Sequence, residues 1–152
     1  MNGLDPFDRY PHSGRQLLGP IRGANARHEY GLRLQRLTNI HSCAYCGLDF
    51  TGSYEHWTML QVDHVVPKSV AIQLGVSIET YNDMVNCVLA CSTCNTFDNR
   101  YTYAAEIAGD ITIDTFLELR DAIFLDRKQR IPQIHARERA FFESRPWELA
   151  SK

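Results

Sequence analysis

The most constraining feature of the sequence is a pair of Cys-x-x-Cys motifs separated by 44 residues, formed by Cys43, Cys46, Cys91 and Cys94. Four thiolates at about 2.3 Å satisfy the tetrahedral coordination of zinc, and two distant motifs of this kind supply them. Two local disulfides or a thioredoxin-like redox motif are the alternatives, but a reducing compartment disfavours the former and the latter needs only one motif. We therefore predict one structural zinc ion.

A zinc ion held by four sulfur atoms has no open position for water or substrate, so it should stabilise the fold and not catalyse a reaction. His41 is a substitute ligand only if one of the four cysteines is displaced. The fifth cysteine, Cys87, lies in an apolar segment and is expected to be a buried small hydrophobic residue. Any catalysis then requires a second centre.

The periodicity of apolar residues predicts an α+β fold, and 152 residues with 44% hydrophobic content are enough for one compact domain. We expect strands at 57–62 and 86–90, and helices at 25–38, 68–74, 77–84, 91–107, 114–130 and 133–143. Pro132 should separate the last two helices. The packing residues of these two helices are expected to be Phe116, Leu119, Ile123, Phe141 and Phe142.

These elements divide the chain into three parts. Residues 1–24 should form an irregular basic arm, residues 25–110 the core with the zinc site, and residues 111–152 a C-terminal helical extension packed on the core. The chain opens without a signal peptide and its apolar stretches are short, so we expect a cytoplasmic protein with no membrane partner.

Charge is distributed unevenly along the chain, whose formal net charge is -2. Residues 1–42 carry six arginines against three acids, a net charge of +3, whereas residues 43–99 carry one lysine against six acids, a net charge of -5. An acidic middle can collect ligands for cations, while a basic arm can contact a polyanion. Chance sorting of solvated charge explains the arm alone equally well.

A second centre is offered by Asp63 and His64, where a hard oxygen ligand precedes a residue type that accepts a proton near neutral pH. An isolated Asp-His dipeptide is more often a polar turn. Here it lies between two predicted strands, the second of which begins at Asn86 and leads to a helix that starts with Cys-x-x-Cys and Asn95.

In this order and spacing the sequence resembles the HNH endonuclease family of ββα-metal (His-Me finger) nucleases, in the zinc-stabilised variant typical of endonuclease VII. The resemblance covers residues 40–100 and rests on Cys43, Cys46, Asp63, His64, Asn86, Cys91, Cys94 and Asn95. It implies a small ββα-metal finger with a four-cysteine zinc site, embedded in flanking α-helices.

The resemblance also implies a role for each matching polar residue. Asp63 and Asn95 would bind the catalytic divalent ion, His64 would be the general base that activates water, and Asn86 would orient His64. An amide oxygen suits a hard ion, so this variant favours Mg²⁺ or Mn²⁺. Lys68 and Asn99 are expected to be ordinary surface residues.

The function implied is hydrolysis of DNA phosphodiester bonds with 5'-phosphate products, and RNA is an alternative substrate. A catalytically inactive, zinc-stabilised module that binds nucleic acid or protein is the rival interpretation. Because the middle of the chain is acidic, phosphate contacts must come from elsewhere. The first candidates are Arg27, Arg33 and Arg36, supported by Arg100 and then by Arg127, Lys128 and Arg130.

Overall fold

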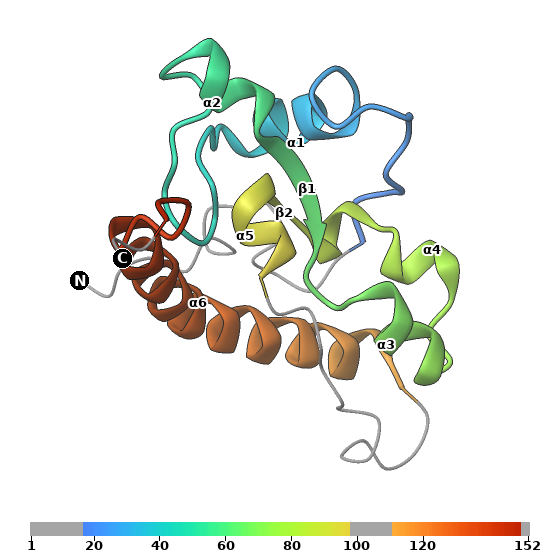
Figure 1. Ribbon diagram of the computed structural model, residues 1–152. Helices are drawn as coiled ribbons and strands as arrows, with labels where there is room; N and C mark the ends of the chain where they lie inside the picture. The colour runs from blue at the N-terminus through green and yellow to red at the C-terminus, as the bar shows by residue number, and fades with distance from the viewer. Residues whose placement is uncertain (1–16, 98–110, 150–152) are drawn as a thin grey trace, which may run out of the picture.

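A two-stranded antiparallel sheet forms the centre of the computed structural model, which describes residues 17–97 and 111–149 (Figure 1). Strand β1 (Leu60–His64) pairs with β2 (Cys87–Cys91), in a register that places Asp63 opposite Val88 and His64 opposite Cys87. Every residue of β2 is buried, including Cys87. The predicted α+β fold is confirmed.

Side chains along β1 alternate between the two faces of the sheet, so Gln61 and Asp63 share one face while Leu60, Val62 and His64 share the other. Helix α5 (Ser92–Thr96) lies against the first face, where Asn95 donates a hydrogen bond to Gln61. Helix α1 (Tyr30–Thr38) packs on the second face. Asp63 and His64 therefore point to opposite faces of the sheet.

Short helices with local caps connect these elements. Helix α2 (Tyr54–Thr58) precedes β1, and α3 (Lys68–Gln73), α4 (Ile78–Tyr81) and the 3-10 helix η2 (Met84–Asn86) lead from β1 to β2. The side chains of Ser53, Ser77 and Asp83 accept hydrogen bonds from the first turns of α2, α4 and η2. The predicted helix at 68–74 is confirmed, and it ends before Gly75, whose positive φ of 73° suits a glycine.

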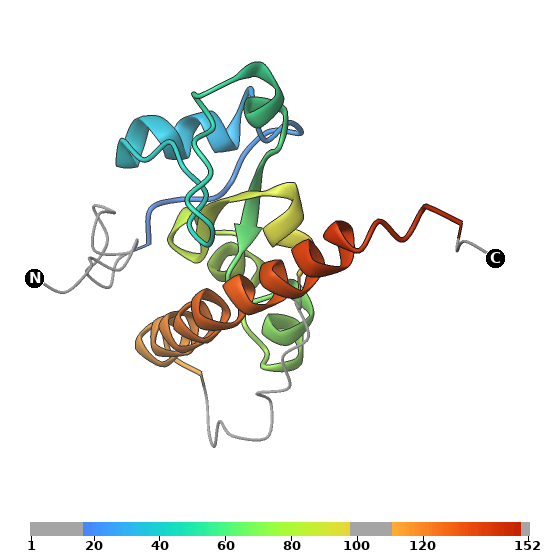
Figure 2. The ribbon, with the colours of Figure 1, turned by 60° about the vertical axis from the view of Figure 1, so that its left-hand side comes forward.

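The long helix α6 (Ile113–Glu143) crosses beneath the sheet, and its C-terminal end projects from the body of the molecule (Figures 1 and 2). A capping box between Thr112 and Thr115 begins it. Phe116, Leu119 and Ile123 are buried as predicted. Phe141 and Phe142 are 62% and 63% exposed, so their assignment to the core is wrong: they lie on the projecting end, where no other described element covers them.

Several predicted boundaries differ from the structure: the helix expected at 25–38 begins only at Tyr30, and the one expected at 77–84 is the single turn Ile78–Tyr81. The strand expected from Trp57 begins at Leu60, because the capped helix α2 occupies Trp57. The helix expected to run to residue 107 ends at Thr96, since Phe97 has an extended backbone with φ −79° and ψ 115°. Helix α6 continues through Pro132, which removes one backbone hydrogen bond while buried Ile131 keeps the helix seated on the core.

Residues 18–21, near the start of the described chain, are hydrogen-bonded to the two residues that precede η2. The carboxylate of Asp83 accepts hydrogen bonds of 2.8 Å from the backbone N–H groups of both Leu18 and Gly19. The N–H of Ile21 donates to the carbonyl of Asn82. Residues 1–16 lie outside the described residues. Within those that are described, no helix is both long and apolar enough to cross a membrane.

We predict that Gly31→Ala destabilises the fold, although alanine normally favours a helix over glycine. A Cβ atom at Gly31 would overlap the carbonyl oxygen of Ala26 and lie 2.8 Å from the side chain of Leu60, so α1 would have to move from the sheet. The expected loss is about 1–3 kcal/mol in the free energy of unfolding by urea. Gly52→Ala, whose Cβ would meet nothing closer than 3.4 Å, is the control. Equal stability of the two variants would contradict the packing described for α1.

Candidate metal centre and catalytic site

Four sulfur atoms form the clearest candidate metal centre. The Sγ atoms of Cys43, Cys46, Cys91 and Cys94, here called the four-cysteine cluster, all lie within 4.8 Å of one another. Those of Cys46 and Cys91 are 3.8 Å apart. A tetrahedron with Zn–S distances of about 2.3 Å has edges of about 3.8 Å, so small side-chain movements would let the four thiols bind a zinc ion.

Local backbone structure positions the sulfurs. Gly47, with a positive φ of 78°, closes the turn formed by residues 43–47, here called the first knuckle. A hydrogen bond from Ala44 N–H to the Leu89 carbonyl joins the first knuckle to β2. In the second motif Cys91 is the N-cap of α5, and its sulfur accepts from the N–H of Cys94 at 3.4 Å. The N–H of Cys91 donates to the sulfur of Cys43 at 3.3 Å. Such N–H···S bonds stabilise thiolates, the form that binds metal.

Because the thiols lie close together, the pKa values of Cys43 and Cys46 shift in opposite directions. Hydrogen bonds from Cys91 and Cys94 lower the pKa of Cys43 well below the usual thiol range. Burial, with the charge of neighbouring thiolates, raises the pKa of Cys46 to about 12. A dication bound among these sulfurs would favour their thiolate forms.

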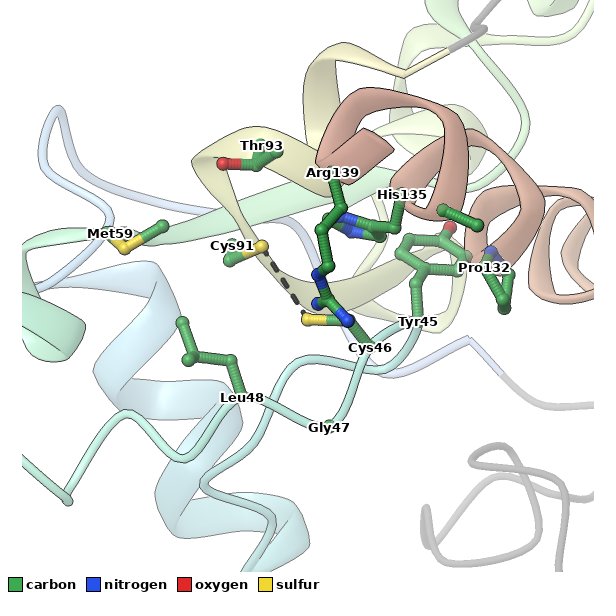
Figure 3. A pocket seen from close by; sticks show the side chains of 11 residues that line it. Tyr45, Cys46, Gly47, Leu48, Met59, Cys91, Thr93, Pro132, His135 and Arg139 are labelled. Carbon is green, nitrogen blue, oxygen red and sulfur yellow. Dashed lines mark hydrogen bonds between the residues drawn. The ribbon is translucent and has the colours of Figure 1, made fainter. Parts of the chain in front are cut away.

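Helix α6 also contacts the four-cysteine cluster. The Nε2 atom of His135 lies 3.1 Å from the sulfur of Cys94, and its ring packs edge-on against Phe97. A pocket of about 610 Å³ lies between α6 and the first knuckle, and Figure 3 shows Arg139 reaching across it toward Cys46. Asp63 and His64 do not line this pocket. His41, considered as a substitute ligand, instead lies near Gln35 and Asn39.

The carboxylate of Asp63 is buried in a network that reaches from the first knuckle to α6. Its Oδ2 accepts a hydrogen bond of 2.5 Å from the Tyr45 hydroxyl and forms an ion pair with the guanidinium of Arg127. Asp63 is 4% exposed. Burial raises the pKa of Asp63 above its usual range, and the Arg127 charge and the Tyr45 hydrogen bond offset part of the rise.

Arg127 lies at the centre of this network. It is 1% exposed, and its Nη2 donates to the carbonyls of Cys94 and Phe97 at 3.2 and 3.4 Å. Its assignment to the surface phosphate contacts is therefore wrong. A signal for burial was present in the sequence: Arg127 falls on the helical stripe that also contains Phe116, Ile123 and Ile131. A charged residue on such a stripe calls for a buried partner.

His64 has a partner that the sequence did not indicate. Its Nε2 lies 3.0 Å from Oδ1 of Asn82, the C-cap residue of α4. Asn86 is fully buried and binds the backbone instead, with Oδ1 accepting from Val66 N–H and Nδ2 donating to the carbonyls of Val66 and Tyr81. Asn86 thus holds the chain that follows His64, whereas Asn82 contacts the imidazole.

The other predicted site residues are distributed over both faces. Asn95 donates from Nδ2 to Oε1 of Gln61 at 2.7 Å, on the same face of β1 as Asp63. Arg33 and Arg36 lie on α1 and border a pocket of about 330 Å³ with Leu37 and Met84. The structure places Lys68 at the exposed start of α3. Asn99 and Arg100 lie outside the described residues.

Three other cationic residues predicted to contact phosphate have local partners, among them Arg27, one of the first candidates. Arg27 is partly buried, lies over the Trp57 ring and donates to the Thr58 carbonyl. Lys128 is exposed beside the Phe124 ring, and Arg130 pairs with Asp126 one turn earlier. Arg33 and Arg36 therefore remain the best-placed candidates among the described residues.

The arrangement of these residues agrees with a comparison against protein families. Residues 43–100 match the family model described as HNH endonuclease, which spans both Cys-x-x-Cys motifs, the hairpin and α5. Comparisons with the curated proteins and with the solved structures gave no significant match. Over residues 43–100 the chain is thus similar to the HNH endonuclease family, and its four-cysteine cluster is consistent with a zinc-binding variant of that family.

Proposed function

We propose that the protein is a metal-dependent HNH endonuclease that hydrolyses phosphodiester bonds of DNA. In this proposal His64 is the general base, Asp63 and Asn95 are the ligands of a divalent ion, and the four-cysteine cluster holds a structural zinc ion. Asn86 acts indirectly by fixing the backbone after His64. The match of residues 43–100 to the HNH endonuclease family implies nucleic acid as the partner class.

The observation that carries the proposal is the contact between His64 and Asn82. An amide oxygen can only accept a hydrogen bond, so the 3.0 Å contact with Asn82 Oδ1 assigns the ring proton of neutral His64 to Nε2. Nδ1 then carries the free lone pair that can accept a proton from water. His64 is only partly buried, so water and substrate can approach it. A positioned base of this kind typically contributes about 10²–10⁴-fold to the rate.

The chemistry of Asp63 and Asn95 fits a hard divalent ion. A carboxylate and an amide oxygen are ligands that Mg²⁺ and Mn²⁺ prefer, with water and phosphate oxygens completing the shell. When bound, such an ion stabilises negative charge on the phosphate and on the leaving oxygen. The bond from Asn95 to Gln61 and the contacts of Asp63 hold the two side chains on one face of β1.

One observation favours the rival function, a catalytically inactive module that binds nucleic acid or protein. The Asp63 carboxylate is buried and paired with Arg127, so its charge is already balanced by a protein group. Incubation of the purified protein with plasmid, branched DNA or RNA, in Mg²⁺, Mn²⁺ or chelator, separates the two functions. Cleavage that requires a divalent ion supports the nuclease, whereas binding without cleavage supports the module.

We predict one zinc ion per chain, measured by elemental analysis, because thiolate ligation couples metal binding to folding. Cys43→Ala should lose the ion and much of the cooperativity of unfolding. Cys87→Ala is the matched control, since Cys87 is equally buried but lies outside the four-cysteine cluster. A folded wild-type protein without zinc would remove the basis of the metal centre.

We predict that His64→Ala lowers the cleavage rate by about 10²–10⁴-fold while zinc content and fold are retained. The control is His41→Ala, which removes an exposed imidazole whose hydrogen bonds in the described structure are to Gln35 and Asn39. In the same assay, Asp63→Asn and Asn95→Ala should raise the Mg²⁺ concentration needed for half-maximal activity. Asp63→Asn is preferred to Asp63→Ala because the amide keeps the shape of the side chain and an oxygen that can accept the hydrogen bonds of Tyr45 and Arg127. Undiminished cleavage by His64→Ala would disprove the assignment of the base.

We predict that Arg33→Ala with Arg36→Ala weakens DNA binding and flattens its salt dependence, because an arginine bound to phosphate releases counterions from DNA. For each phosphate that loses its arginine partner, the slope of log affinity against log salt should fall by about 0.7–0.9. The double variant Arg137→Ala, Arg145→Ala removes the same charge from the exposed end of α6 and the segment that follows it, and serves as control. Equal effects of the two double variants would show that total charge, and not α1, governs binding.

A further inference from the structure

The two oxygens of the Asp63 carboxylate have different surroundings. Both the Tyr45 hydroxyl and the Arg127 guanidinium bind Oδ2. Within the described part of the chain, no hydrogen-bond donor binds Oδ1, so none would compete with a metal ion for that atom. Aspartates that bind metal through one oxygen are commonly hydrogen-bonded through the other, because that bond fixes the direction of the ligating atom.

We propose that Tyr45 and Arg127 are positioning residues for the divalent ion: by holding Oδ2 of Asp63 they direct Oδ1 toward the ion that Asp63 shares with Asn95. This inference rests on the proposed function and adds two residues to its site. Arg127 lies in α6, outside the segment 43–100 that matches the HNH endonuclease family.

The two groups that donate to Oδ2 of Asp63 are held in fixed positions, because each of them has several further contacts. Tyr45 is 5% exposed, its ring packs against Phe124 with centroids 5.4 Å apart, and the Arg127 guanidinium lies 4.5 Å from the ring centroid. Nη1 of Arg127 also donates to the Tyr45 hydroxyl at 3.0 Å. A donor in a fixed position constrains the acceptor that it binds.

The same contacts link the two metal centres. Tyr45 stands between the zinc ligands Cys43 and Cys46, so the geometry of the first knuckle sets the position of its hydroxyl. The Nη2 atom of Arg127 holds the carbonyls of Cys94 and Phe97, which flank Asn95 along α5 and its C-cap. One guanidinium therefore fixes the elements that carry both proposed ion ligands, Asp63 and Asn95.

The opposite interpretation is that Arg127 and Tyr45 prevent Asp63 from binding a divalent ion, because they bind its carboxylate in place of the ion. The two interpretations predict opposite changes in ion affinity. If the contacts position the carboxylate, weakening them lowers the affinity for a divalent ion. If the contacts compete with the ion, weakening them raises it.

The decisive variant is Tyr45→Phe, which removes the hydroxyl but keeps the buried ring. Mn²⁺ is the probe, and electron paramagnetic resonance of the free ion gives the dissociation constant without any need for cleavage. Outer-shell changes typically cost about 10–100-fold in metal affinity, and we expect a loss near the lower limit with zinc content unchanged. Tyr54→Phe, at an exposed tyrosine without a contact to Asp63, is the matched control.

A second pair of variants covers the case in which Tyr45→Phe loses zinc. Arg127→Lys keeps the charge but loses the planar fork, so it should also weaken Mn²⁺ binding. Arg120→Lys is its control, because Arg120 is equally buried on α6 and binds Val85 and Asp121. Unchanged or tighter Mn²⁺ binding by Tyr45→Phe, or by Arg127→Lys where Tyr45→Phe loses zinc, overturns the inference.

Comparing Mn²⁺ binding with cleavage distinguishes a failure of this inference from a failure of the proposed function. Wild-type protein that binds Mn²⁺ through Asp63, as shown by loss of binding in Asp63→Asn, but cuts no nucleic acid would refute the endonuclease and leave the positioning role intact. Wild-type protein whose Mn²⁺ binding is insensitive to Asp63→Asn would refute both.

Discussion

The approach of four sulfur atoms to within 4.8 Å of one another is the constraint on which the remaining structure depends. It joins a turn near residue 45 to the junction between β2 and α5. A hairpin of two five-residue strands is marginally stable by itself, and its register would be weakly determined. The four-cysteine cluster and the buried β2 strand select one arrangement, and β1, which carries Asp63 and His64, is paired to that strand.

Helix α6 adds to the small hairpin a set of buried apolar side chains and a charged partner for Asp63. Its first half buries Phe116, Ile123 and Phe124 against the core, and it inserts the guanidinium of Arg127 between β1, the first knuckle and α5. Burying a charged pair costs desolvation energy that the ion pair and its hydrogen bonds must offset, so such pairs more often specify an arrangement than increase stability. Asp63 is consequently held by a residue 64 positions away in the chain.

The alternation of a β-strand shapes the proposed site. Asp63 faces α5 and α6, whereas the neighbouring His64 faces the opposite side and contacts Asn82. Both side chains lie near the end of β1, where the strand gives way to the segment that Asn86 holds in place. In the proposed function, a phosphate that contacts both residues would bind at this end of the hairpin.

The sequence by itself determined the four-cysteine cluster, the hairpin and the helix at 68–74, because ligand spacing and apolar periodicity are local properties. Only the tertiary structure decided that Arg127 pairs with Asp63, that Asn82 and not Asn86 contacts the His64 ring, and that Phe141 and Phe142 are exposed. These outcomes depend on which segments distant in the chain pack together. A periodic pattern can show that one face of a helix is buried, but it does not identify the partner across the interface or where that interface ends.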